Sequence, residues 1–313
     1  MNQATILIAA ALALAATLPA TPAQAQNPRT FVSGHGSDAN DCTLPSPCRT
    51  FAHAITVTNA GGEIDVLDVA GYGALTIDKA ISIVNDGVGT ARILVPAAGQ
   101  GIVINAGPND AINLRGLIIE GAGAGFNGIV FNSGKSLTIE NCVVRNVNGF
   151  GISFVPSVTS ALAVSNTLVA DNGVNGIEVN PNGSAIVSAV FHRVEVNNNG
   201  GHGISVSGSG TTGTVNAVAS ESVAARNGGS GFRAVDFGPS SATFSLFLSV
   251  AANNGVGISA NNLGATLRVA HSMVTGNIHG WDASNSAVIE SFGDNYIAGN
   301  GTNTGVLTSV GKQ

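Results

Sequence analysis

A Gly followed by one large apolar residue recurs along most of this chain at intervals of 23 to 28 residues. The apolar position is followed by a mostly polar one and then by another apolar one, which is the period of two of a strand with one buried face. The Gly–apolar pairs are Gly128 and Ile129, Gly151 and Ile152, Gly176 and Ile177, Gly203 and Ile204, Gly231 and Phe232, Gly257 and Ile258, Gly280 and Trp281, and Gly305 and Val306.

The position between the two apolar columns is mostly polar along the whole repeat, so we expect it to point away from the core. Its members are Val130, Ser153, Glu178, Ser205, Arg233, Ser259 and Asp282. Trp281 stands in the first apolar column, which predicts a core residue rather than a surface platform for sugars.

An Asn stands shortly before each later Gly, where a second strand of the repeat must turn. We expect these Asn residues to adopt positive φ, which Asn tolerates better than most residues. An apolar residue lies three positions before each Asn. The Asn residues are Asn146, Asn172, Asn199, Asn227, Asn253, Asn277 and Asn300.

A repeat of about 25 residues with two or three short strands cannot bury its own apolar face, so it must stack on its neighbours. In such a stack each strand pairs with its counterpart one turn further on. The pattern therefore predicts an all-β fold, a parallel β-helix with about ten coils. We expect one solenoid domain over residues 61–313, preceded by an N-terminal cap over residues 26–60.

Residues 1–25 have the features of a secretory signal peptide. An apolar run over residues 5–17 is followed by the small-x-small sequence Ala23-Gln24-Ala25. This predicts cleavage after Ala25 and a secreted or periplasmic protein. The alternative is a leader that is retained as a membrane anchor, for which the apolar run is short. No later stretch is long and apolar enough to span a bilayer, so we expect no membrane span after cleavage.

Composition narrows the function classes. Only 10% of the residues are charged, and 18 acidic against 12 basic residues give a net charge of −6. Because no basic stripe exists, nucleic acid is not an expected partner. The many Gly residues, 42 in all, suit short strands and tight turns.

The segment "GSDANDCTLPSPCRTFAHAI" crowds two Cys residues among His and Asp residues just after the predicted leader. In an exported chain Cys42 and Cys48 predict a local disulfide, while Cys142 is expected to be a buried core residue. Ser46 before Pro47 is typical of a helix start. We interpret His35, Asp38 and Asp41 as turn residues and predict no metal site here.

The "N-x-x-x-G-I" turns and the head sequence resemble the right-handed parallel β-helix superfamily typified by pectate lyases. The resemblance implies a single-stranded right-handed solenoid with an N-terminal capping helix over its first coil. It does not imply one activity, because this fold carries lyases, hydrolases, epimerases, adhesins and inert scaffolds.

Pectate lyases hold calcium with clustered acids and use an Arg as base. No such cluster is found here, so no cofactor is predicted and calcium has no support. Arg145, Arg193 and Arg226 qualify as the base by residue type only.

One group of acids has the spacing for catalysis. Asp171, Glu195 and Glu221 belong to successive coils, and one coil plus two residues separates the last two by roughly 8 Å, as in inverting glycosidases. Glu178, His192 and Arg193 are expected to line the same region as hydrogen-bonding groups for sugar hydroxyls. The His of the second "GHG", His202, is interpreted as a solvated turn residue.

Two classes of function remain open. The favoured class is an exported non-enzymatic scaffold or carbohydrate-interacting protein, because a recognisable catalytic set is missing and exposed aromatic residues are few. The alternative is a polysaccharide-active enzyme, either a lyase or an inverting glycoside hydrolase. In both cases the expected partner is an extracellular polysaccharide, and the protein is expected to be a monomer.

Overall fold

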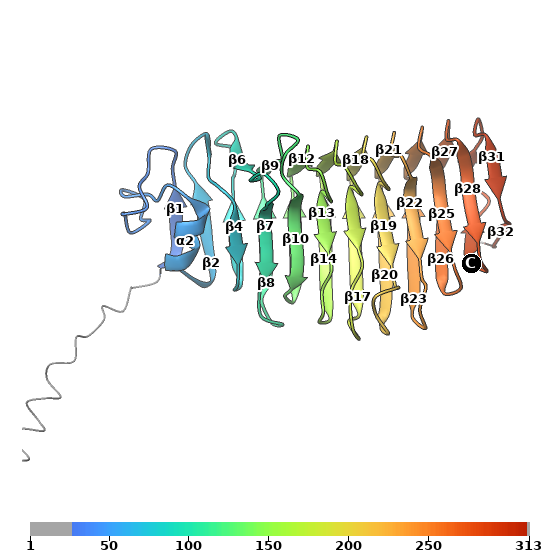
Figure 1. Cartoon of the computed structure of the whole chain (residues 1–313), viewed down its shortest axis with the longest axis horizontal. Helices are drawn as coiled ribbons and strands as arrows, with labels where there is room; N and C mark the ends of the chain where they lie inside the picture. The colour runs from blue at the N-terminus through green and yellow to red at the C-terminus, as the bar shows by residue number, and fades with distance from the viewer. Residues whose placement is uncertain (1–26, 312–313) are drawn as a thin grey trace, which may run out of the picture.

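The chain winds through three parallel β-sheets in a computed structural model that describes residues 27–311 (Figure 1). Each turn passes through sheet 1, then sheet 2, then sheet 3. Sheets 2 and 3 contain ten strands each, so their first and last strands lie nine turns apart, close to the predicted ten. The predicted all-β parallel solenoid is confirmed. The predicted signal peptide lies outside the described residues.

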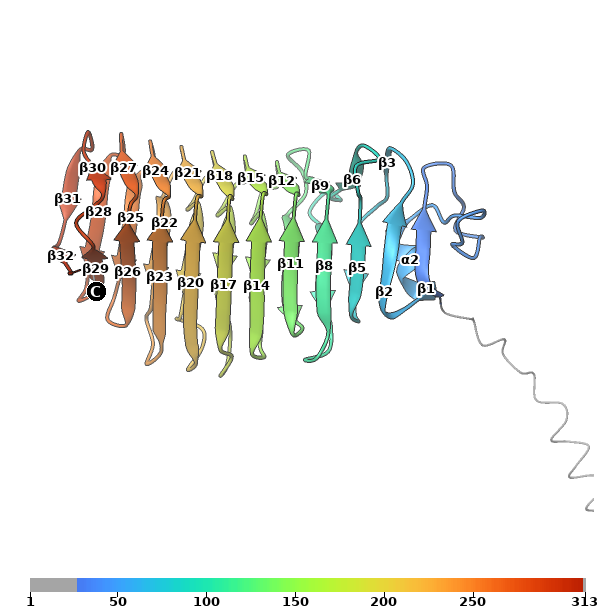
Figure 2. The ribbon, with the colours of Figure 1, turned by 180° about the vertical axis from the view of Figure 1, so that it is seen from behind.

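Sheet 1 contains twelve strands and forms the long face seen in Figure 2. In spatial order its strands are β1 (Asn27–Val32), β2 (Thr58–Val66), β5 (Ile81–Val84), β8 (Ala111–Arg115), β11 (Ser136–Glu140), β14 (Ser160–Ser165), β17 (Val187–His192), β20 (Thr214–Ser220), β23 (Ser241–Phe247), β26 (Ala265–Ala270), β29 (Val288–Ser291) and β32 (Leu307–Ser309).

Sheets 2 and 3 are built from shorter strands. Sheet 2 contains β3 (Ala70–Gly71), β6 (Ala91–Leu94), β9 (Leu117–Glu120), β12 (Val143–Arg145), β15 (Leu168–Ala170), β18 (Glu195–Asn197), β21 (Val223–Ala225), β24 (Val250–Ala252), β27 (Met273–Thr275) and β30 (Tyr296–Ile297). Sheet 3 contains β4 (Leu75–Ile77), β7 (Gln100–Asn105), β10 (Asn127–Ser133), β13 (Ile152–Phe154), β16 (Ile177–Val179), β19 (Ile204–Ser207), β22 (Ser230–Val235), β25 (Val256–Asn261), β28 (His279–Ser284) and β31 (Thr302–Thr304).

The apolar columns of the sequence are in register across the turns and fill the interior. Ile152 pairs with Ile177, and Ile177 pairs with Ile204 on the next strand; all three are fully buried. The second column brings Phe131 and Phe154 together as stacked rings with centroids 4.5 Å apart. The pattern fails at the C-terminal end, where Trp281 is only partly buried and Val306 is exposed. There β31 pairs Thr302 with His279, so Gly305 does not continue the Gly column.

A ladder of buried Asn side chains supports the turn between sheets 2 and 3. Each side chain accepts the backbone N–H of its counterpart one turn earlier, at 2.8–3.3 Å. The ladder consists of Asn172, Asn199, Asn227, Asn254, Asn277 and Asn300.

The Asn residues of the ladder do not adopt positive φ, so the prediction of positive φ was wrong for Asn172, Asn199, Asn227, Asn277 and Asn300. Positive φ belongs to the residue before each one, for example Asn198 and Arg226. The prediction is correct for Asn146 and Asn253, which have positive φ because they stand at the bend. The inward position that follows them is taken by Val147 and by Asn254. The inward Asn must face the interior to reach the next coil, whereas the exposed residue before it makes the bend.

A helix covers the first turn of the solenoid, as the resemblance implied. Helix α2 (Phe51–Val57) lies at the N-terminal end of the solenoid (Figure 1). It buries Phe51 and Ile55, and the centroid of the Phe51 ring lies 5.0 Å from that of Tyr72. Its N-cap is Thr50, whose side chain accepts the N–H of His53. Ser46 instead bridges to Thr43 in a loop, so the predicted helix start was four residues too early.

The cysteines have the predicted states. Cys42 and Cys48 form a disulfide, and Cys142 is a free, buried thiol. Burial raises the pKa of Cys142 to about 11, which leaves it protonated and unreactive. Asp38 accepts the backbone N–H groups of Arg49 and Thr50, consistent with a role in shaping the loop. Within residues 27–311, no helix has the length and apolar character to cross a bilayer.

Candidate functional site

The three acids proposed as catalytic lie at three different places in the turn. Asp171 makes the bend between sheets 2 and 3, Glu195 begins β18, and Glu221 makes the bend between sheets 1 and 2. All three are exposed. Their catalytic role stays a prediction, and their surroundings are those of solvated surface groups.

Register shows which of these residues come together. Glu195 pairs with Val223, so Glu221 lies one strand and two residues away, roughly 8 Å between backbones as expected. Asp171 lies opposite Asn198, three residues beyond Glu195, and accepts a hydrogen bond from the Asn198 amide at 2.5 Å. The three acids therefore do not converge.

Two of the predicted sugar-binding residues lie beside the Glu221 bend. Arg193 Nε lies 3.0 Å from Glu221 Oε2 in an exposed ion pair, and His192 Nδ1 lies 3.0 Å from Ser220 Oγ. An exposed pair of this kind contributes at most about 1 kcal/mol of stability. It also engages the carboxylate that the hydrolase hypothesis would need free.

Glu178 lies on a different surface, the outward face of sheet 3. It belongs to an in-register polar column that we call the sheet-3 row. The strands pair Ser153 with Glu178, Glu178 with Ser205, Ser205 with Arg233, Arg233 with Ser259, and Ser259 with Asp282. In contrast to the three exposed acids, every member of this row is at least partly buried.

The carboxyl group of Glu178 is largely withdrawn from water. Desolvation raises its pKa, and this exceeds the opposing effects of the hydrogen bond from Asn175 and of the charge of Arg233. The Asn175 amide donates to Glu178 Oε2 at 2.6 Å. A carboxyl group in such a setting can accept a further hydrogen bond from a ligand.

Arg233 occupies the centre of the row, two strands from an acid on either side. Its pKa is lowered by burial, while the charges of Glu178 and Asp282 act in the opposite direction. Its Nε donates to Asn261 Oδ1 at 3.2 Å, and the Asn261 amide donates to Asp282 Oδ2 at 3.0 Å. The guanidinium is thus oriented through one nitrogen, and its other donor groups are available for a ligand.

His202 completes the cluster and is not the solvated turn residue that the sequence suggested. It is largely buried, and burial together with the charge of Arg233 lowers its pKa to about 4. Its Nδ1 accepts the backbone N–H of Ser230 at 2.8 Å. The neutral ring therefore carries its proton on Nε2, where it is a hydrogen-bond donor and not a base.

The sheet-3 row does not contain a pair of acids at catalytic distance. It presents hydrogen-bond donors that an anionic or hydroxyl-rich ligand could accept. Glu178 and Asp282 lie four strands apart, about 19 Å at the usual strand spacing, which is far beyond the separation in glycosidases. Arg233 and the Nε2–H of His202 are both donors near the middle. This combination suits a carboxylate or several sugar hydroxyls.

The same face of sheet 3 is hollowed at its N-terminal end. A cleft of about 600 Å³ lies beside helix α2, lined by Ala52, Thr76, Gln100, Val103 and Asn132 among others. Thr76 and Val103 occupy the column that continues into the sheet-3 row.

The sequence carried part of the signal for this surface. Arg233 and Asp282 stood in the polar column of the repeat, but their partners in space depend on which coils are neighbours. For His202 the signal was misleading, because a "GHG" in a turn does not reveal how closely Gly229 and Ser230 of the next coil pack against the ring. A Cβ at Gly229 would lie only 2.6 Å from His202 Nδ1.

Comparison with known proteins agrees with this architecture. The family model described as the right handed beta helix region matches residues 53–219, so the chain belongs to this family of β-helix proteins. In sequence, no curated protein matches the chain.

Solved structures with the same fold include polysaccharide-active enzymes. Pectate lyase Pel9A is 16% identical, with a TM-score of 0.56, over 91% of this chain and 78% of that one. The alginate lyase from Paenibacillus sp. str. FPU-7 is 13% identical, with a TM-score of 0.55, over 90% of this chain and 99% of that one. At these identities the likeness shows the fold alone.

Proposed function

We propose that this protein is an exported, non-enzymatic carbohydrate-binding β-helix that holds an extracellular polysaccharide along the outward face of sheet 3. The observation that carries the proposal is the sheet-3 row, where Glu178, Arg233 and Asp282 are partly buried, oriented polar groups on an otherwise sparsely charged molecule. Elsewhere the candidate acids are solvated, as expected of an ordinary protein surface.

The spacing of the row favours an extended polymer. Its charged members, Glu178, Arg233 and Asp282, recur every second strand, about 10 Å apart along the solenoid axis, so an extended polymer would meet one basic group between two acidic ones. Arg233 with the Nε2–H of His202 favours a polymer that bears carboxylates. The lyases with the same fold act on pectate and alginate by their names, and both are uronate polymers.

Calorimetric titration with a panel of acidic and neutral polysaccharides tests the proposal. We expect an acidic polymer to bind, and Arg233→Gln to weaken its affinity at least tenfold, because a charge-assisted contact is removed. The matched control is Arg193→Gln, which lies on the sheet 1–sheet 2 edge and should bind as the wild type does. Equal loss from both variants, or no binding across the panel, would refute the sheet-3 surface.

A uronate lyase is the second candidate, favoured by the neutral His202 beside Arg233. Both groups would stabilise the negative charge on the uronate carboxylate, while Glu178 would accept the neighbouring proton as the base and the glycosidic oxygen would leave with a proton from water. Incubation with uronate polymers, with and without calcium, should then produce the absorbance of an unsaturated product. If no product forms while binding is retained, the protein binds without cleavage; release of reducing sugar instead would indicate hydrolysis.

Export also belongs to the proposal. Cleavage after Ala25 would leave Gln26 as the first residue of the mature chain, in the periplasm or outside the cell. Mass spectrometry of the protein recovered from these fractions checks the cleavage site, and light scattering checks that it is a monomer. An intact Met1 in the recovered protein would contradict export by this route.

A further inference from the structure

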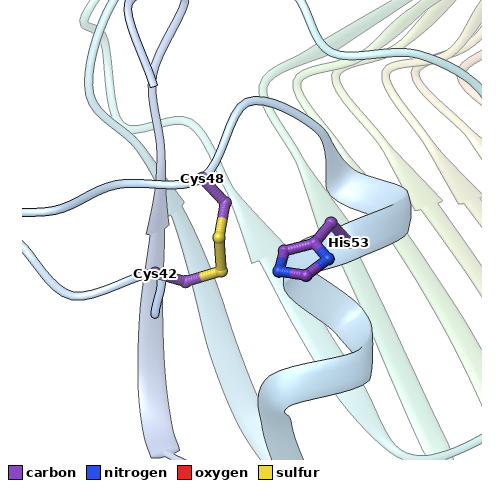
Figure 3. A group of neighbouring side chains, drawn as sticks. All are labelled: Cys42, Cys48 and His53. Atoms are coloured by element: carbon purple, nitrogen blue, oxygen red, sulfur yellow. A yellow bond between two sulfur atoms is a disulfide. The ribbon is translucent and has the colours of Figure 1, made fainter. Parts of the chain in front are cut away.

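The head of the protein brings two sulfur atoms and one imidazole together in a way that the sequence did not predict. The ligand atoms of Cys42, Cys48 and His53 all lie within 4.8 Å of one another (Figure 3). His53 had been expected only as part of the capping helix. Two thiolates and one imidazole are a ligand set that Zn²⁺ prefers, whereas the disulfide form offers only weak sulfur donors.

The backbone holds the two cysteines next to each other independently of the disulfide. The Phe31 N–H donates to the Cys42 carbonyl at 2.9 Å, and the Cys48 N–H donates to the Phe31 carbonyl at 3.0 Å. The Ser33 N–H donates to the Cys48 carbonyl at 2.9 Å. Both residues are thereby fixed to strand β1, so the sulfurs should remain neighbours after the bond between them is reduced.

His53 reaches the cysteines from a separate element. It lies in the first turn of α2, where its N–H is held by Thr50 Oγ1 at 3.1 Å. Its half-buried side chain lines a surface cleft of about 460 Å³ together with Asp38, Asn40 and Asp41. Cys42 and Cys48 are fully buried behind it, so His53 is the member of the group that borders the cleft, and the nearby carboxylates favour the approach of a cation.

We propose that the reduced head binds one thiophilic divalent ion, such as Zn²⁺, through Cys42, Cys48 and His53. A dithiol reductant converts the disulfide to two thiols and is itself oxidised to a disulfide. Binding of the ion then releases two protons as both thiols become thiolates. A water molecule would complete the tetrahedral coordination.

The geometry requires one local adjustment. Sulfur ligands of a tetrahedral Zn²⁺ lie about 3.8 Å apart, given Zn–S bonds of about 2.3 Å. The two Cα atoms lie 4.6 Å apart, so rotation of the two Cys side chains would have to supply this separation. The imidazole already lies within reach, so the ion would connect α2 to the cysteine loop in place of the disulfide.

Cobalt substitution of the reduced, full-length mature protein tests the site directly. Co²⁺ should bind in a ratio of one to one, with thiolate-to-metal charge-transfer absorption, and an equivalent of Zn²⁺ should displace it. The oxidised protein should bind neither ion. His53→Gln should weaken Zn²⁺ binding at least tenfold in competition with a chromogenic chelator, whereas Cys142→Ser, which removes the buried thiol, should change nothing.

Three outcomes would overturn the proposal: reduced protein without stoichiometric Co²⁺, equal binding by oxidised protein, or unchanged affinity in His53→Gln. Circular dichroism of each variant distinguishes loss of ligand from loss of fold. The test does not depend on polysaccharide binding, because the head and the sheet-3 row are different surfaces.

Discussion

The side chains of the Asn ladder show how a single residue type can define a turn. Asn227, for example, accepts from the Asn199 backbone and side chain and donates to the Val196 carbonyl at 2.9 Å. It is almost completely buried, so each of these groups depends on it for a partner.

We predict that Asn227→Ala lowers the free energy of unfolding by about 1–3 kcal/mol, because buried polar groups lose their partners. Urea denaturation followed by circular dichroism measures the change. The control is Asn253→Gly, at an exposed position with φ of 57°, where Gly is tolerated and the effect should be within about 0.5 kcal/mol. Similar losses in both variants would show that the ladder does not carry the stability.

His202 predicts a pH dependence with a definite sign. Its pKa is about 4 in the folded protein and near 6.5 when unfolded, so the unfolded chain binds more protons between these values. Stability should therefore fall as the pH drops from about 6.5 to about 4, by at most about 3 kcal/mol, and His202 should cause no further loss below that range.

Urea denaturation at several pH values, with an NMR titration of the His202 ring, checks this prediction. In His202→Asn the part of the slope between pH 4 and 6.5 that belongs to this residue should disappear. An NMR midpoint near 6.5 would mean that the ring is solvated after all.

At the scale of elements, helix α2 protects the end of the first turn. Phe51 is fully buried, packs on Tyr72, and donates its N–H to the Tyr72 carbonyl. Without this cover, the apolar interior at the end of the stack would contact water, and such ends promote association.

We predict that Phe51→Ala costs about 3–5 kcal/mol and exposes the first turn preferentially. Hydrogen exchange should accelerate in β2, β4 and β5 but not in the distant β22 and β25. Ala52→Ser, at an exposed position on the same helix, is the control and should leave exchange unchanged. Uniform acceleration along the solenoid would mean that the helix does not act locally.

At the scale of the whole molecule, each turn contacts mainly the turns before and after it, so stability is approximately a sum of neighbour interactions. The central turns have neighbours on both sides. The last strand of sheet 3, β31, has one neighbour, and its three residues are exposed.

Hydrogen exchange should therefore show a gradient along the solenoid axis. We predict the slowest exchange in β13, β16, β19 and β22 and the fastest in β31 and β32, because an end turn opens without breaking contacts on its far side. Mass spectrometry of peptides after timed labelling measures the gradient. Equal protection in all turns would indicate one cooperative unit instead.

The sequence determined the fold to a large extent, because stacking makes every repeat meet the same requirements. The Gly column and the inward Ile and Phe residues could be recognised from periodicity, and the resemblance of the turns and the head sequence indicated the family. The register of the ladder could not, since consecutive Asn residues such as Asn253 and Asn254 differ only in which of them faces the interior.

The candidate site depended on the tertiary structure. Asp171, Glu195 and Glu221 are close in the repeat but diverge around its bends, while Glu178, Arg233 and His202 lie on different coils and meet on one face. Their pKa values are set by burial, which the sequence of a single coil does not contain. The repeat thus determined that this protein is a β-helix, and only the stacking of one coil on the next decided which of its polar residues act together.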